Sequence, residues 1–114
     1  MPQVDQGAER FGWSPRPSDH PLENGKAATL YVQFSPEGAA VSDLGSTLES
    51  IGPMTPEVET AVRHVCRAND VQLEDGALLA KVPPGGDVGE AVDRLGRVCA
   101  RINRTASEAA SPGR

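Results

Sequence analysis

The alternation of apolar and polar positions predicts two β-hairpins. Between residues 28 and 34, apolar side chains alternate with more polar ones, which is the period of a half-buried strand. Residues 35–38 read Ser-Pro-Glu-Gly, a turn signal, so a short second strand is expected over residues 39–42. Residues 71–73 and 77–82 flank Glu-Asp-Gly, and Asp-Gly between apolar runs is typical of a hairpin. The pattern therefore predicts a small antiparallel sheet built from two hairpins.

Apolar residues at helical spacing predict three helices. A brief helix is expected around residues 48–51, and a second one extends from its N-cap Thr55 to about residue 69. The third has the longest apolar seam of the chain, from residue 88 to about residue 105, with Asp87 as its cap. The expected order is β-β-α-α-β-β-α. This order defines an α+β fold with the helices packed on one face of the sheet.

The composition changes toward both ends of the chain. Gly and Pro recur throughout residues 1–26, so this segment is expected to be an extended or flexible arm. Residues 27–106 are expected to form a single α+β domain, and residues 107–114 a disordered tail. Aromatic residues make up only 4% of the 114 residues, so the core must consist of aliphatic side chains.

The net charge, the absence of long apolar runs and the positions of the two cysteines limit the classes of protein to which the chain can belong. A net charge of -5 argues against a protein whose main task is to bind nucleic acid. No long apolar run and no basic-then-apolar start is present, so we expect a cytoplasmic protein without a membrane partner. Cys66 and Cys99 lie on the apolar stripes of predicted helices and are expected in the core, without a disulfide.

No set of residues has the spacing of a catalytic or metal site. His20 falls in the predicted arm, and His64 falls on the polar side of its helix. The chain contains neither a Walker phosphate loop nor a nucleophile elbow. We therefore expect no catalytic residues, no cofactor and no metal, which means a protein that is not an enzyme.

Asp43, Gly45 and Thr47 form an Asp-x-Gly-x-Thr sequence after the first hairpin. This sequence resembles the first phosphate loop of the actin and sugar-kinase superfamily, which would imply a phosphate ligand. The second phosphate loop and the acidic partner of that superfamily are not visible in the chain. The favoured interpretation is a structural turn, in which Asp43 and Gly45 shape the bend and Ser46 or Thr47 caps the next helix.

Four arginines recur at helical spacing along the third helix, on the side opposite its apolar seam: Arg94, Arg97, Arg101 and Arg104. Glu90 and Asp93 precede the first two by one turn, which favours a solvated face with internal ion pairs. Arg101 and Arg104 have no acid four residues before them. The alternative interpretation is an anion-binding face, which lacks the aromatic side chains that stack on bases.

Phe11 and Trp13 are half of the aromatic residues of the chain, and both fall in the predicted arm. One interpretation is packing against the domain. The other is that these rings anchor a partner, because large aromatic side chains dominate many interfaces.

Several segments together resemble a known family. They are the strand Leu-Tyr-Val-Gln-Phe at 30–34, the turn Ser-Asp-Leu-Gly-Ser-Thr-Leu at 42–48, the hairpin at 74–76 and the last helix. The chain resembles a family of uncharacterised bacterial and phage domains over roughly residues 17–104. The resemblance implies a phage or mobile-element context and no settled activity. The element order is also similar to that of small dimeric chaperones of bacterial secretion systems.

These observations predict a small, non-enzymatic protein-interaction module with an antitoxin, counter-defence or chaperone-like role. Its partner would be another protein or a second copy of the chain, with Phe11 and Trp13 as contact residues. An open edge of the sheet offers a place for a partner strand. The alternative is a protein that binds nucleic acid or a phosphate ligand through the face from Arg94 to Arg104.

Overall fold

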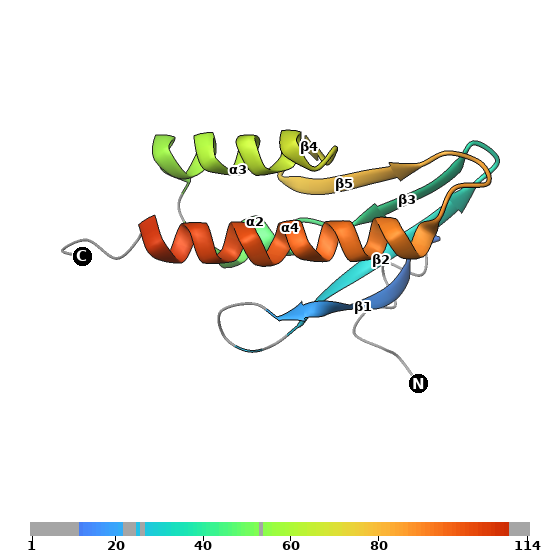
Figure 1. Ribbon diagram of the computed structural model, residues 1–114, viewed down its shortest axis with the longest axis horizontal. Coiled ribbons are helices and arrows are strands. Elements are labelled where there is room, and N and C mark those ends of the chain that lie inside the picture. Colours follow the sequence, from blue (N-terminus) through green and yellow to red (C-terminus); the bar gives the residue numbers. More distant parts are fainter. Residues whose placement is uncertain (1–11, 22–24, 26, 53, 110–114) are drawn as a thin grey trace.

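A computed structural model gives the fold and describes residues 12–21, 25, 27–52 and 54–109. Its elements, in chain order, are β1 (Ser14–Pro21), β2 (Ala27–Ser35), β3 (Gly38–Ser42), α2 (Ser46–Ser50), α3 (Pro56–Ala68), β4 (Gln72–Glu74), β5 (Ala77–Val82) and α4 (Val88–Ala109). The predicted α+β class is confirmed, because these elements form one antiparallel sheet and three helices (Figure 1).

The sheet has five strands in the order β1-β2-β3-β5-β4, and every neighbouring pair is antiparallel. Both predicted hairpins are present, as β2–β3 and β4–β5. The second closes through Asp75 and Gly76, whose φ angles of 51° and 79° are the left-handed values that a two-residue type I′ turn needs. Val41 of β3 lies opposite Ala80 of β5, which joins the two hairpins into one sheet.

The structure differs from the sequence-based prediction at the N-terminal segment. Residues 14–21 form β1, which pairs with β2 so that Ser14 lies opposite Val32. The domain therefore begins before residue 27, and the element order gains a strand at its start. Pro15 and Pro17 are compatible with this strand because β1 is at the edge of the sheet, where a missing N–H need not break the ladder.

The C-terminal boundary also differs from the prediction. The helix α4 continues to Ala109, four residues beyond its expected end at about residue 105 and into the expected tail. Residues 110–114 lie outside the described part of the chain. The small side chains after residue 105 are compatible with helix, and Ala106 is buried against the core, which explains the longer helix.

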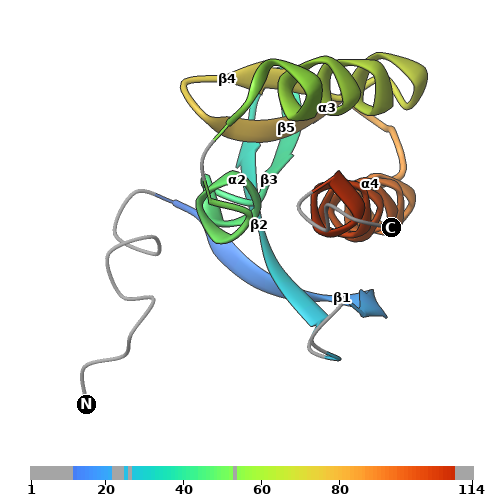
Figure 2. The same cartoon turned by 90° about the vertical axis from the view of Figure 1, so that its left-hand side faces the viewer.

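The core lies between the sheet and the two long helices. Figure 2 shows the sheet curving around α4, while α3 packs over the β4 and β5 side. The largest fully buried apolar side chains come from the strands and from the two long helices: Leu30, Val32, Val41, Val62, Leu78, Leu95, Val98 and Ile102. Helices thus cover one face of the sheet, as the sequence predicted, and the core is aliphatic.

Both long helices begin at the predicted caps. Thr55 Oγ1 accepts a hydrogen bond from Val58 N at 3.2 Å, and Pro56 occupies the first helical position of α3. Asp87 Oδ1 accepts a hydrogen bond from Glu90 N at 3.1 Å at the start of α4. Each cap satisfies an N–H that has no partner within the helix, so the helix starts are determined locally.

Gly96 is the point at which β1 approaches α4. A Cβ atom on Gly96 would clash with Ser18 Oγ and would lie 3.2 Å from Cδ2 of His20. Because Gly96 leaves this space open, the strand can pack directly on the helix backbone, and Ser18 is buried there.

We expect Gly96→Ala to destabilise the protein although alanine favours helix. The added methyl group should cost about 1–3 kcal/mol through overpacking, against a gain of up to about 1 kcal/mol in helix propensity. Urea unfolding measures the net effect. Gly89→Ala, near the exposed start of α4, is the control: its Cβ would lie 3.3 Å from Asp87 Oδ1 and would touch no strand, so the unfolding free energy should stay unchanged or rise by up to about 1 kcal/mol. Equal effects of the two substitutions would contradict this packing.

Candidate functional site

The Asp43 turn is the first candidate site, and its carboxylate is completely buried. Asp43 Oδ1 accepts hydrogen bonds from Gly45 N at 3.0 Å and Leu78 N at 2.9 Å, and Oδ2 accepts one from Thr47 N at 3.0 Å. Gly45 has a φ of 90°, in the left-handed region that favours glycine. The N-cap of α2 is Gly45, without a side-chain hydrogen bond, so the expectation that Ser46 or Thr47 caps this helix is wrong. The carboxylate thus joins the β3–α2 turn to β5, and both oxygens are engaged by backbone within the protein.

The two cysteines lie near this turn and are free and buried. Burial raises the pKa of the Cys99 thiol to about 12, although a hydrogen bond with Thr47 acts in the opposite direction. Burial also raises the pKa of Cys66, and the nearby Asp43 carboxylate adds to this effect. Both thiols are therefore protonated at neutral pH, and neither has the thiolate character of a nucleophile or a metal ligand.

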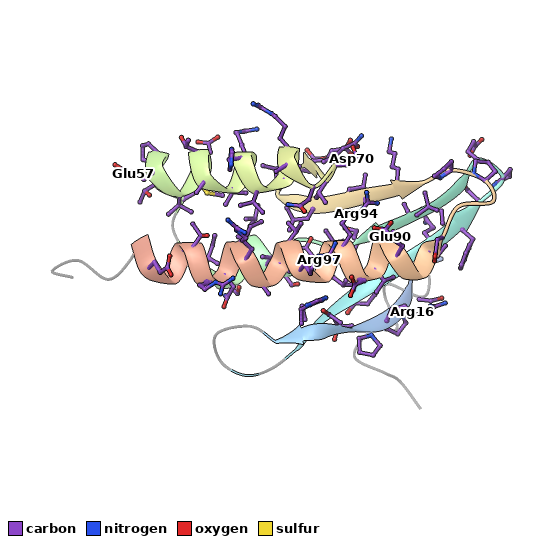
Figure 3. The ribbon with its side chains drawn as sticks, in the orientation of Figure 1. Arg16, Glu57, Asp70, Glu90, Arg94 and Arg97 are labelled. Atoms are coloured by element: carbon purple, nitrogen blue, oxygen red, sulfur yellow. The ribbon has the colours of Figure 1, made fainter. Side chains whose placement is uncertain are left out.

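The four arginines of α4 do not share one environment. Arg97, Arg101 and Arg104 are exposed, as predicted for the outer face of the helix. The side chain of Arg94 is only 19% exposed, which corrects the prediction that all four lie on the outer side. Figure 3 shows Arg94 between α4 and the region of Asp70, and its Nη1 lies 3.8 Å from Asp70 Oδ2. Helical spacing alone did not reveal that α3 packs against this flank.

His20 contacts α4, contrary to the expectation that it lies in a flexible arm. Its Nε2 atom lies 2.8 Å from Asp93 Oδ1, and Arg97 pairs with the other oxygen of the same carboxylate. The hydrogen bond with His20 holds the pKa of Asp93 below its usual value, and Arg97 acts in the same direction. Asp93 therefore links β1 to α4. His64 is exposed on α3, as predicted.

A basic groove lies on the outer side of α4, next to this contact. It has a volume of about 320 Å³ and is lined by His20, Asn69, Arg97, Val98, Ala100, Arg101 and Arg104. The lining therefore comes from β1, from the end of α3 and from α4. Three of the four predicted arginines meet here, while Arg94 does not line the groove.

The second candidate surface is the hairpin end, which we define as Phe34 and the two hollows beside it. Phe34 is 62% exposed and is the most exposed large apolar side chain among the described residues. A hollow of about 230 Å³ includes Phe34, Pro36, Pro83, Pro84 and Val88 in its lining. A second hollow of about 530 Å³ is lined by Gln33, Ser35, Glu37, Ala39, Ala40, Lys81, Val82 and Pro83.

Trp13 lies beside the hairpin end, whereas Phe11 is outside the described residues. Since Ser14 lies opposite Val32, the same register places Trp13 next to Gln33, which lines the larger hollow. A Cβ on the preceding Gly12 would lie 3.5 Å from Gln33 Nε2, which agrees with this placement. Trp13 is half-buried, so part of its ring area remains accessible.

The described part of the chain shows no other site of a recognised kind. Within it, no three His, Cys, Asp or Glu side chains lie together in a way that would hold a metal ion. None of the described helices combines the length and apolarity needed to span a bilayer. Sequence reasoning missed Phe34 as a surface residue, because its place in the alternation indicated the core face.

Comparisons of the chain with protein-family models, with curated proteins and with solved structures found no match. The resemblance to bacterial and phage domains therefore stays a prediction.

Proposed function

We propose that the protein is a non-enzymatic module that binds another protein through the hairpin end. The observation that carries the proposal is the exposure of Phe34, which is 62% accessible beside a hollow formed by prolines and Val88. Burying a fully exposed phenylalanine side chain contributes about 1.5–3 kcal/mol, and the larger part of this contribution is not realised while Phe34 is 62% exposed. A partner that covers Phe34 would gain it.

The shape around Phe34 supports docking of side chains into the two hollows. Val82 and Pro83 line both hollows, so the hollows adjoin each other across the end of β5. Trp13 extends the larger hollow on the outer face of the sheet, whereas Phe34 shares the opposite face with Val32. A partner that contacts both rings therefore wraps around the end of the β2–β3 hairpin. An aromatic anchor beside shallow apolar hollows, with Glu37 and Lys81 at the rim, has the arrangement of an interface core and its polar border.

The edges of the sheet are less suited to a partner strand than the sequence suggested. β1 carries Pro15 and Pro17, and each proline removes a backbone donor from that edge. β4 has only three residues, and its Gln72 and Glu74 side chains are exposed. Such short or proline-containing edges protect a sheet from strand addition. The proposed partner therefore contributes apolar side chains, and a strand added to the sheet is not required.

The test is recovery of a partner from lysate of the native host, followed by mass spectrometry. Phe34→Ser and Trp13→Ala should each weaken recovery of that partner at least about tenfold, since loss of an anchor costs 2 kcal/mol or more. Met54→Ser is the matched control, because Met54 is 40% exposed and precedes α3, which begins at the opposite end of the molecule (Figure 1).

Recovery should also survive replacement of Arg101 and Arg104 by Gln at high salt, because exposed charge contacts are weak and screened. Equal loss with Met54→Ser, or tolerance of both Phe34→Ser and Trp13→Ala, would contradict the proposal.

A further inference from the structure

The basic groove has a charge that the described residues neutralise only in part. Asp93 is engaged by both His20 and Arg97. Arg101 and Arg104 form no ion pair with any described residue, and this includes Glu108, which lies one turn after Arg104. Two guanidinium groups without an ion-pair partner among the described residues therefore line one concavity, on a protein whose net charge is -5.

We propose that this groove binds the phosphate group of a small phosphorylated molecule. Residues three apart on a helix are neighbours on its surface, so Arg101 and Arg104 can approach one anion together. A guanidinium presents planar pairs of N–H donors that match phosphate oxygens, and such charged hydrogen bonds are among the strongest in proteins. Arg97 lies in the same row, one turn before Arg101, although its ion pair with Asp93 neutralises part of its charge.

The walls of the groove favour a ligand with hydroxyl or ring nitrogen groups next to its phosphate. Asn69 donates its amide Nδ2 to Val65 O at 2.8 Å, which fixes the amide at the end of α3 and leaves its carbonyl oxygen to accept. His20 forms the opposite wall and is held by Asp93. Ala100 provides apolar contact between these walls.

The size and charge of the groove favour a compact ligand over a nucleic-acid strand. A volume of about 320 Å³ accommodates a molecule at the small end of the usual ligand range. The row from Arg97 to Arg104 spans only about 10 Å along the helix, at 1.5 Å per residue. A long polyanion would extend beyond this row and over the rest of an acidic protein, whose net charge repels it. A single phosphate group interacts mainly with charges within a Debye length of about 8 Å, which keeps it close to the arginines.

Isothermal titration calorimetry and NMR of arginine Nε–H groups test the proposal with inorganic phosphate, AMP and a single-stranded oligonucleotide as probes. AMP should bind the parent at low salt and shift the Arg101 and Arg104 signals. The double variant Arg101→Gln/Arg104→Gln should lose at least about tenfold in affinity, because it removes both charged donors that face the phosphate. Arg63→Gln/Arg67→Gln removes the same charge from exposed positions of α3 and should bind AMP within about twofold of the parent.

Three results would overturn the proposal. They are no binding of either phosphate probe, an equal loss in the α3 control, and tight binding of the oligonucleotide alone with a salt dependence that indicates several phosphates. The last result would identify a nucleic-acid face. Phe34→Ser should leave AMP binding unchanged. Failure of the groove to bind phosphate can therefore be distinguished from failure of the hairpin end to bind a protein.

Discussion

Replacing Leu95 by Asp is expected to abolish cooperative unfolding. The Leu95 side chain is completely buried and belongs to the core. It lies on α4, around which the sheet curves (Figure 2). An aspartate there would be a buried charge without a partner, and its burial costs several kcal/mol or forces the helix away from the strands. Since small domains are stable by only about 5–15 kcal/mol, this cost removes most of the stability.

Circular dichroism melts and urea titrations measure this effect. Arg101→Asp introduces the same residue on the exposed side of the same helix and should retain a cooperative transition close to that of the parent. If the Leu95→Asp protein melts within a few degrees of the parent, the assignment of the buried face of α4 is wrong.

The second large effect is expected for Asp43→Asn. An amide group cannot accept at both of its polar atoms, so at least one of the N–H groups of Gly45, Thr47 and Leu78 loses its acceptor. Leaving a buried donor unsatisfied costs about 1–3 kcal/mol, and loss of the charged acceptor weakens the remaining bonds. The unfolding free energy should therefore fall by about 2–4 kcal/mol.

Asp75→Asn is the matched control, because Asp75 is exposed in the β4–β5 turn and asparagine suits its positive φ. Urea unfolding should give a stability close to that of the parent. Calorimetry with ATP addresses the alternative use of the Asp43 turn. ATP binding that is present in the parent, absent in Asp43→Asn and retained in Arg101→Gln/Arg104→Gln would favour a phosphate loop and contradict the structural interpretation.

Much of the fold could be predicted from the sequence because its signals are local. The caps Thr55 and Asp87 act within three residues, and the Asp75-Gly76 turn requires only its own backbone angles. The strand β1 could not be predicted in this way. Its prolines argue against a strand in general, and they are tolerated only because β1 lies at the edge of the completed sheet.

The candidate sites depended more strongly on contacts between distant residues. The sequence predicted that Asp43 shapes a turn, but its bond to Leu78 N joins residues 35 positions apart. Likewise, His20 and Asp93 are 73 positions apart, so the groove between β1 and α4 has no local signal. Phe34 follows the alternation of a core strand, yet it is exposed in the completed fold. Exposure is a property of the whole fold, and alternation alone does not determine it.

Site-specific photo-cross-linking in cells of the native host can show whether a protein docks at the hairpin end. A photoreactive amino acid at Glu37, in the β2–β3 turn, is compared with one at Thr60, which is exposed on α3. We expect a cross-link from position 37 to one protein of defined mass, lost with Phe34→Ser and retained with Arg101→Gln/Arg104→Gln. Cross-links of equal yield from both positions, or a cross-link from position 37 that Phe34→Ser does not weaken, would contradict docking at this end.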